Sequence, residues 1–227
     1  MSLFCCLAVV ITEGDIWVYG VCSVAVAGIT FLFLLANTDL FLITSAQASL
    51  DFLSDADLRT TTQVERSLKA VSLWESTGAV IMAVRRPGCS LCREEASALC
   101  SLKSELDELG VPLYAVVKEN IGTEIRDFKP YFCGEIFVDE KQRFYGSEPR
   151  RMKALGIVRL GVWRNLLLTW KKGYRGNMKG EGFVLGGLFV IGPGKQGILL
   201  EHKEKEFGDK ADLSSVLEAA KKIQKEK

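Results

Sequence analysis

The sequence has few of the residues that build metal sites. Its 227 residues include one histidine, His202, and one C-x-x-C motif, Cys89 to Cys92, with no second copy. A tetrahedral zinc site would therefore lack two ligands, and we predict no bound metal. The seven cysteines are odd in number and have no framework spacing, and a chain of this length needs no disulfide to complete its core. This usage favours a reducing compartment.

The chain also lacks an excess of charge of either sign. Its 29 Lys and Arg residues balance 28 Asp and Glu residues, which gives a formal net charge of +1. Such a balance provides no general attraction to polyanions, so we predict no nucleic-acid partner. The glycine-rich segment 192–195 is not a phosphate-binding loop, because no helix and no Ser or Thr follow it.

The N-terminal part contains the longest uncharged run. Ile16–Ala36 holds 21 residues without a charge, which is long enough to cross a bilayer as a helix. A cleaved signal peptide fits less well, because no Lys or Arg precedes the run and Glu13 and Asp15 do. We expect a hydrophobic helix that either anchors the chain in a membrane or packs on the domain. The expected location is cytoplasmic, with membrane association through Ile16–Ala36 and secretion both left open.

Composition divides the chain into three parts. Residues 1–36 form the hydrophobic segment, residues 37–62 a linker with a short amphipathic helix within Ala46–Leu58, and residues 63–227 the main domain. Ser67–Glu75 is expected to form a short helix at the start of that domain, because Leu68, Val71 and Trp74 would share one side.

The centre of the main domain is a strand followed by the two-cysteine motif. Ala79–Val84 is a short, continuous apolar run, typical of a strand covered on both faces. After Cys92 the apolar residues recur at helical spacing up to Leu109, and Gly110 is a stop signal. Cys89 and Cys92 are therefore predicted to lie where a strand passes into a helix.

That position suits thiol chemistry. The free N–H groups and the positive end of a helix dipole stabilise an anion, and a C-x-x-C thiol near cations can be a thiolate at neutral pH. We predict Cys89 as the nucleophile, Cys92 as the resolving thiol, and Arg85 and Arg86 as electrostatic support. The reverse order of the two cysteines stays open, as does a structural disulfide.

The remaining segments complete an α/β fold with a central mixed sheet flanked by helices. A strand–helix–strand unit with a short link implies a right-handed parallel crossover. Cys133 is expected to be a buried small residue. The predicted elements are a strand at Leu113–Val117, a helix or two turns at Ile121–Phe132, a strand at Glu135–Asp139, a hairpin of Gly187–Ile191 with Gly197–His202, and a final helix capped by Asp212.

Residues 150–172 carry seven basic side chains and no acid. In a continuous helix, Lys153, Arg164 and Lys171 would fall on one line, with apolar residues on another face. A basic amphipathic helix of this kind can lie on an anionic membrane or pack on the sheet with its cations in solvent. We expect packing, because Gly156 and Gly161 interrupt the pattern.

The order of these elements is that of a thioredoxin fold, and several segments resemble a narrower group. AVIMAVRRPGCSLCREEA, LGVPLYAVVKE, GEIFVDE, GEGFVLGGLFVIG and GKQGILLEHKEKEFGD are similar to the peroxiredoxin-like 2 family. The resemblance implies a thioredoxin-like (peroxiredoxin-like) fold, antioxidant activity dependent on Cys89 and Cys92, a mainly cytoplasmic location, and regulation of redox-sensitive signalling. In typical peroxiredoxins, Cys89 would be threonine, Cys92 the catalytic cysteine and Arg85 proline.

The leading hypothesis is a thiol-dependent oxidoreductase that acts on a peroxide or another small oxidant. It needs no bound cofactor, and an external reductant such as thioredoxin or glutathione closes the cycle. Two alternatives remain: a reductase of lipid or prostaglandin-type endoperoxides, and a non-enzymatic binding module whose dithiol senses redox state.

Overall fold

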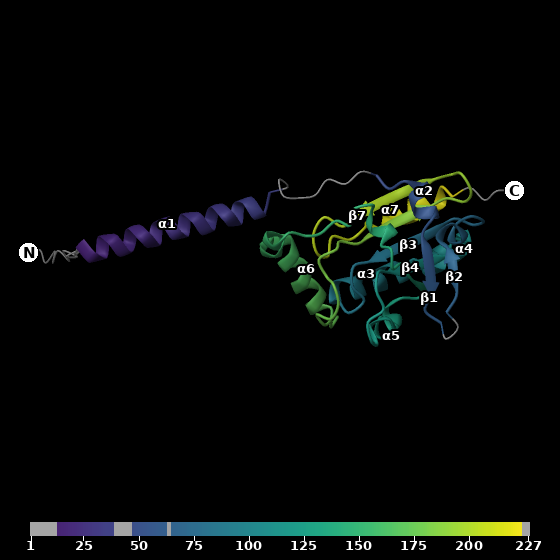
Figure 1. Ribbon diagram of the computed structural model, residues 1–227, viewed down its shortest axis with the longest axis horizontal. Helices are drawn as coiled ribbons and strands as arrows, with labels where there is room; N and C mark the ends of the chain where they lie inside the picture. Colours follow the sequence, from purple (N-terminus) through teal and green to yellow (C-terminus); the bar gives the residue numbers. More distant parts are fainter. Residues whose placement is uncertain (1–12, 39–46, 63–64, 224–227) are drawn as a thin grey trace, which may run out of the picture.

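The computed structural model describes residues 13–38, 47–62 and 65–223 (Figure 1). The helices are α1 (Glu13–Ala36), α2 (Leu50–Ser54), α3 (Ser90–Cys100), α4 (Lys103–Leu109), α5 (Glu124–Phe128), α6 (Leu160–Lys171) and α7 (Leu213–Lys221). The strands are β1 (Asp57–Thr60), β2 (Ser67–Lys69), β3 (Ala79–Val84), β4 (Leu113–Val117), β5 (Glu135–Val138), β6 (Gly187–Ile191) and β7 (Ile198–Lys203). Four 3₁₀ turns are η2 (Ala70–Leu73), η3 (Lys129–Tyr131), η4 (Arg143–Tyr145) and η5 (Ala154–Val158).

The strands form one mixed sheet in the order β2-β1-β5-β4-β3-β6-β7. β3, β4 and β5 run parallel, as the crossover rule requires. β6 is antiparallel to β3, and β7 pairs with β6 as its hairpin partner. The chain therefore has the thioredoxin-like α/β fold that the sequence predicts, with β3 inside the sheet between β4 and β6.

β3 explains how one strand serves two cores. Successive side chains of a strand point to opposite faces, so Val80, Met82 and Val84 join one cluster and the alternate residues join another. The first cluster includes Cys89 and Cys92 and packs under α3 and α7, while the second includes Trp74 and Phe144 and packs under α2 and η4. All six β3 side chains are buried, and the continuous apolar run predicts this.

Of the two helices predicted near the sheet edge, one is confirmed in shortened form and the other is wrong. The short helix predicted within Ala46–Leu58 is α2, which is followed by β1, whereas Ser67–Glu75 forms β2 and η2 in place of a helix. β1 pairs with both β2 and β5, so the segment taken for a linker contributes a strand to the sheet. The reason is non-local: Leu58 lies opposite Leu68, and this pairing outweighs local helical spacing.

The helix that carries the motif is shorter than predicted. It begins at Ser90 and ends at Cys100, and a second helix, α4, starts at Lys103. The Ser101 side chain donates to the Ala98 carbonyl at 2.7 Å, a bond that competes with continued helix. α4 ends at Gly110, whose φ of 67° is the left-handed conformation expected of a helix-ending glycine.

The N-terminal hydrophobic segment forms a single helix, α1, which extends away from the sheet (Figure 1). Arg159 contacts the C-terminal end of α1: its Nη1 donates to the carbonyls of Ala36 and Thr38 at 3.1 and 3.0 Å. Within residues 13–38, 47–62 and 65–223, no helix combines the length and apolar character that crossing a bilayer requires.

Candidate redox site

The two thiols lie at the junction between β3 and α3. Cys89 is the N-cap residue of α3 and Cys92 stands in its first turn. Both are free thiols and both are buried, with exposed fractions of 5% and 3%. The Cys89 N–H donates to the Arg86 carbonyl at 3.0 Å, which closes the turn between strand and helix. The free N–H groups of the first helical turn therefore surround the Cys89 sulfur.

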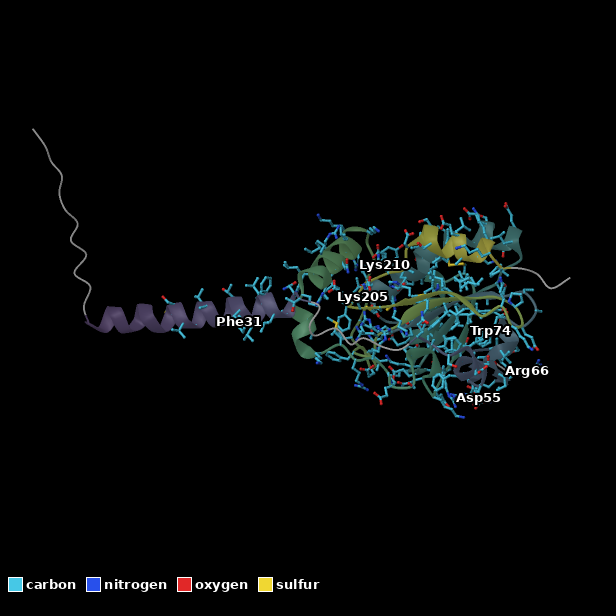
Figure 2. All side chains as sticks on the ribbon, turned by 90° about the horizontal axis from the view of Figure 1, so that it is seen from above. Phe31, Asp55, Arg66, Trp74, Lys205 and Lys210 are labelled. Carbon is cyan, nitrogen blue, oxygen red and sulfur yellow. A yellow bond between two sulfur atoms is a disulfide. The ribbon has the colours of Figure 1, made fainter. Side chains whose placement is uncertain are left out.

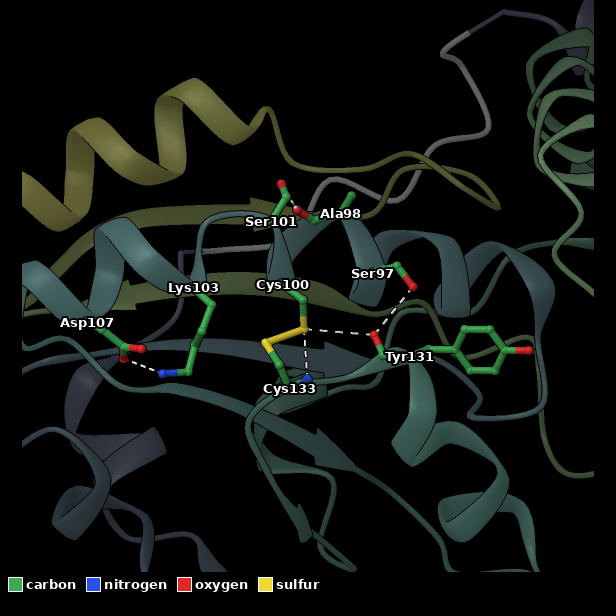
Figure 3. Close-up of a disulfide and its surroundings, with 8 residues drawn as sticks. All are labelled: Ser97, Ala98, Cys100, Ser101, Lys103, Asp107, Tyr131 and Cys133. Atoms are coloured by element: carbon green, nitrogen blue, oxygen red, sulfur yellow. Dashed lines mark hydrogen bonds and ion pairs between the residues drawn. A yellow bond between two sulfur atoms is a disulfide. The ribbon is translucent and has the colours of Figure 1, made fainter.

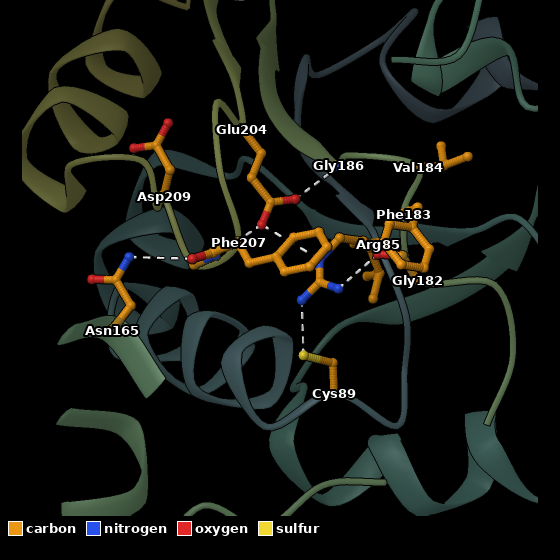
Figure 4. Close-up of polar contacts among 12 residues, drawn as sticks. Arg85, Cys89, Asn165, Gly182, Phe183, Val184, Gly186, Glu204, Phe207 and Asp209 are labelled. Carbon is orange, nitrogen blue, oxygen red and sulfur yellow. Dashed lines mark hydrogen bonds and ion pairs between the residues drawn. The ribbon is translucent and has the colours of Figure 1, made fainter. Parts of the chain in front are cut away.

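Arg85 supplies a buried positive charge directly to Cys89 (Figure 4). Its Nη2 donates to the Cys89 Sγ at 2.9 Å, and its Nη1 donates to the Gly182 carbonyl at 2.9 Å. The guanidinium also lies over the Phe207 ring, 4.2 Å from the ring centre. Because Arg85 is only 3% exposed, solvent does little to screen its attraction for a thiolate.

Glu204 stands on the other side of this arginine. Its Oε1 lies 3.5 Å from the Arg85 Nε, and the carboxylate accepts N–H groups from Gly186 at 2.9 Å and Gly208 at 3.0 Å. Burial raises the pKa of Glu204. Arg85 is thus shared between a carboxylate and a thiol, both buried.

The two thiols differ in acidity. The hydrogen bond from the Cys92 thiol, with the charge of Arg85 and the N–H groups of Leu91 and Cys92, holds the pKa of Cys89 well below its usual range. The same hydrogen bond, together with burial, raises the pKa of Cys92 well above its usual range. The pair therefore favours the thiolate on Cys89 over the thiolate on Cys92.

Glu94, one helical turn into α3, has cationic partners of its own. It accepts from Thr169 and Lys172 and lies 2.7 Å from the Lys210 Nζ. Burial alone would raise the pKa of Glu94, but these three donors lower it to about 2. These partners neutralise the Glu94 charge, so it opposes a thiolate on Cys89 only weakly.

The other arginines near the motif do not contact the thiols. The Arg86 guanidinium, predicted as electrostatic support, instead places its Nη2 3.5 Å from the Met178 sulfur. Arg93 donates to the carbonyls of Pro87 and Arg175 at 3.1 and 2.9 Å. Of Arg85 and Arg86, the structure brings only Arg85 to Cys89; the adjacent side chain of an extended segment points to the other side.

Residues 173–182, which follow α6, lie across the motif. The Asn177 N–H donates to the Gly88 carbonyl at 2.7 Å, and the Asn177 amide donates to Glu124 at 3.0 Å. Gly176 lies so close that a Cβ there would be 2.4 Å from the Ser90 nitrogen. This contact needs glycine, and the segment covers the buried thiols.

Sequence reasoning missed three site residues, Glu204, Phe207 and Gly182. Each lies far along the chain from the motif and reaches Arg85 only because β6 and β7 fold back beside β3. One signal was present in the sequence: Phe207 is a lone aromatic residue in the otherwise charged run HKEKEFGDK. Such a residue indicates a buried contact within a polar segment.

Cys133 does not fit the prediction of a buried small residue. It is exposed and forms a disulfide with Cys100, at the far end of α3 from Cys89 (Figure 3). The Cys133 N–H also lies 2.7 Å from the Cys100 sulfur. The two residues are 33 positions apart, so no local sequence pattern predicts the disulfide.

A cavity of about 440 Å³ lies on the other side of the sheet from α3. It opens between α2, η4 and the β6–β7 hairpin, and Phe52, Phe144 and Phe189 form its apolar wall. Neither Cys89 nor Cys92 lines it, so the redox site is not part of this cavity.

Comparison with known proteins places the chain in a family. Residues 98–206 match the family model of AhpC/TSA antioxidant enzymes. Peroxiredoxin-like 2A of Danio rerio is 65% identical over 92% of this chain and 96% of its own length. The chain belongs to the peroxiredoxin-like 2A family. The Homo sapiens member of that family is 61% identical over 91% of this chain and 90% of its own length.

Membership of the peroxiredoxin-like 2A family supports a thiol-dependent redox role. The matched antioxidant region begins at residue 98, after Cys89 and Cys92, so the match itself does not include the motif. Among solved structures, the bacterioferritin comigratory protein of Xanthomonas campestris aligns at 15% identity with a TM-score of 0.49, over 79% of this chain and 98% of that one.

Proposed function

We propose that this chain is a thiol-dependent antioxidant oxidoreductase whose Cys89 thiolate attacks a peroxide. The sulfur takes the terminal oxygen of the peroxide, so an S–O bond forms as the O–O bond breaks. Cys89 becomes a sulfenic acid and the peroxide leaves as an alcohol or water. The proton for the leaving oxygen comes from the Cys92 thiol, which is hydrogen-bonded to Cys89.

The second step uses the thiolate that this proton transfer leaves on Cys92. It attacks the Cys89 sulfenic sulfur, forms an S–S bond and expels hydroxide, which takes a proton to become water. The product is a Cys89–Cys92 disulfide. Thioredoxin or glutathione supplies the two electrons that return both residues to the reduced state, and no bound cofactor takes part.

The observation that carries the proposal is the 2.9 Å contact between the Arg85 Nη2 and the Cys89 sulfur inside the protein. A buried guanidinium stabilises a thiolate on the residue that it touches, and the thiolate is the nucleophilic form. This favours Cys89 over Cys92 as the attacking residue, although Cys92 has the position of the catalytic cysteine in typical peroxiredoxins.

The proposed cellular role is regulatory as well as protective. A dithiol that oxidises to a disulfide changes the charge at the β3–α3 junction, and the segment 173–182 that covers it is bound to that junction. Through this change the protein would modulate a partner in redox-sensitive signalling. We propose a cytoplasmic location, where glutathione and thioredoxin are available as reductants. The Cys100–Cys133 disulfide is at variance with a fully reducing compartment, so the proposal requires this bond to withstand those reductants.

The test follows the fully reduced full-length chain after hydrogen peroxide, an organic hydroperoxide or a lipid endoperoxide is added. Intact mass and thiol alkylation are recorded against time. We expect a Cys89–Cys92 link that accounts for a loss of two hydrogens, is resolved in the peptide map from the Cys100–Cys133 disulfide, and is reversed by thioredoxin. The oxidant that reacts fastest identifies the substrate class.

Oxidation of both cysteines no faster than free cysteine with all three oxidants would rule out the enzyme. The hypothesis of a non-enzymatic, redox-sensing binding module would then replace that of an enzyme. The Cys89→Ser/Cys92→Ser variant separates the two: an enzyme loses turnover, whereas a scaffold that does not use the dithiol keeps its partner.

A further inference from the structure

α6 leaves most of its surface in solvent. Among its side chains only Val162 and Thr169 are buried, and both face the domain. Five large apolar residues are exposed instead: Leu160 at 60%, Trp163 at 54%, Leu167 at 56%, Leu168 at 44% and Trp170 at 73%. Exposed tryptophan is costly to leave in water, and two on one short helix indicate a surface that another phase or molecule covers.

Four of these residues, Leu160, Trp163, Leu167 and Trp170, form one stripe. Their spacing of three, four and three positions places them on one side of a helix with 3.6 residues per turn. Val162 and Thr169 lie on the opposite side, toward α3. The side of α6 that packs on the domain is therefore narrow, and the larger apolar residues lie on the side that faces solvent.

Positive charge borders the stripe. Arg164 and Lys171 are both exposed and lie one helical step beside Leu160 and Leu167. In the part of the chain that the structure describes, neither makes a salt bridge with an acidic side chain. The surrounding segment 150–180 has no acid and nine basic residues: Arg150, Arg151, Lys153, Arg159, Arg164, Lys171, Lys172, Arg175 and Lys179.

α6 also lies beside the end of α1. The Leu160 N–H donates to the Asn37 side chain at 2.9 Å, and Arg159 holds the Ala36 carbonyl. Both views show α1 leaving the domain at the side where α6 lies (Figures 1 and 2). Phe31, labelled in Figure 2, is 61% exposed on α1. Exposed apolar groups are therefore concentrated at one end of the molecule.

We propose that α6 seats the protein on an anionic lipid surface, lying in the plane of the interface without crossing the bilayer. Tryptophan rings prefer the headgroup level of a membrane, and Leu160 and Leu167 would reach the acyl chains between them. Arg164 and Lys171 would extend to lipid phosphates and carboxylates. Charge complementarity selects this occupant, since α6 carries no acid and its exposed cations, Arg164 and Lys171, lie beside the apolar stripe, whereas Arg151, Arg159, Lys172 and Lys179 of the surrounding segment are paired with acids.

The expectation that the basic segment packs on the domain holds in part: α6 packs on α3 through Val162 and Thr169, but large apolar residues are in solvent as well as cations. The glycines that interrupt the pattern are explained by the start of the helix: Gly156 lies in η5, before α6, and Gly161 follows the first residue of α6. Lys153 lies outside the helix, so only Arg164 and Lys171 of the predicted line remain on α6. The proposal is independent of the redox chemistry proposed for Cys89.

The experiment reports on α6 itself, because α1 could attach the full-length chain to vesicles by another route. The full chain with Trp17→Phe keeps Trp163 and Trp170 as its exposed tryptophans, with Trp74, 1% exposed, as an internal reference. Vesicles with brominated acyl chains are made from phosphatidylcholine alone or with about 30% phosphatidylserine. Tryptophan quenching and the emission maximum are recorded.

We expect quenching and a blue shift on the anionic vesicles, and little of either on phosphatidylcholine alone or at high salt. Arg164→Glu/Lys171→Glu should weaken the quenching titration on anionic vesicles by at least about tenfold. The matched control is Lys195→Glu/Lys221→Glu, which makes the same change in net charge at exposed sites remote from α6 and should leave the titration unchanged.

Three results would overturn the proposal. Tryptophans that stay unquenched when the protein sediments with anionic vesicles would mean that another segment makes the contact. Equal quenching for the α6 charge variant and the control would remove the role of Arg164 and Lys171. A fluorescence response to duplex DNA with none to anionic vesicles would assign the surface to nucleic acid instead.

Discussion

Arg85 and Cys89 form a buried pair in which the arginine Nη2 donates to the cysteine sulfur across 2.9 Å. Both residues belong to the single turn that joins β3 to α3. The strand fixes the arginine and the helix fixes the cysteine, so the pair is set by backbone geometry. This contact lowers the pKa of Cys89, while the pKa of Cys92 is raised, so the negative charge is favoured on Cys89.

Neutralising Arg85 should slow the reaction of Cys89. In Arg85→Met the Cys89 pKa rises because its closest cation is gone, and the rate of alkylation at pH 6 should fall by about tenfold or more. The measurement is iodoacetamide labelling of Cys89 from pH 5 to 9, followed by mass spectrometry. Arg86→Met is the matched control, since the Arg86 guanidinium contacts Met178, and its profile should follow wild type. Equal loss in both variants would contradict the assigned role of Arg85.

Glu204→Gln should move the same profile in the opposite direction. Glu204 offsets part of the Arg85 charge at an Oε1–Nε distance of 3.5 Å, so an uncharged amide leaves more positive potential for the thiols. The midpoint of Cys89 alkylation is expected at a lower pH than in wild type. A midpoint that rises with this variant would show that Glu204 acts by positioning Arg85 and not through its charge.

Glu95 should make the stability of the protein depend on pH. Burial, together with the nearby Glu204, raises the pKa of Glu95 to about 8, against Lys210 and the Ala211 N–H, which lower it. The folded protein binds the Glu95 proton more tightly than the unfolded chain, in which the pKa of a glutamate is about 4.3. The stability that this provides is fully present below about pH 4.3 and is lost as the pH rises toward about 8. Thermal unfolding should show Glu95→Gln gaining stability relative to wild type between pH 5 and 8.5. A constant difference over that range would refute the shift.

Removing the second cysteine pair should destabilise the domain without silencing the site. Cys100→Ser/Cys133→Ser opens the loop that the disulfide closes over 33 positions, which by the chain-entropy estimate costs about 3 to 4 kcal/mol. Urea unfolding measures the loss, and wild type reduced with dithiothreitol is the control for the serine changes. Cys89 alkylation should be preserved, because the disulfide is at the opposite end of α3. If Cys89 alkylation were lost along with stability, the Cys100–Cys133 disulfide would be needed for the reactivity of Cys89, which contradicts the prediction.

The sequence predicts the central elements well because each depends on local pattern. β3, β4 and β6 have the predicted bounds, and Asp212 caps α7 with its side chain accepting the Ser215 N–H. The position of Cys89 and Cys92 at the start of a helix follows from the same patterns. Apolar runs and capping residues act over a few positions, so they can be read from one sequence.

Contacts between segments that are distant along the chain could not be predicted from the sequence. β1 and β2 are short strands whose pairing depends on Leu58 meeting Leu68, and their local spacing suits a helix equally well. Glu204 meets Arg85 only after β7 has paired with β6. The choice of Arg85 over Arg86 likewise depends on which side chain faces the motif, since the two are adjacent and chemically alike.

The most direct test of the account is which cysteine forms the sulfenic acid. Cys92→Ser and Cys89→Ser are treated with the fastest oxidant in the presence of dimedone, and the adduct is located and timed by mass spectrometry. The account predicts rapid labelling of Cys89 in Cys92→Ser and little labelling of Cys92 in Cys89→Ser. Labelling of Cys92 in Cys89→Ser at an equal or higher rate would contradict it and make Cys92 the attacking residue.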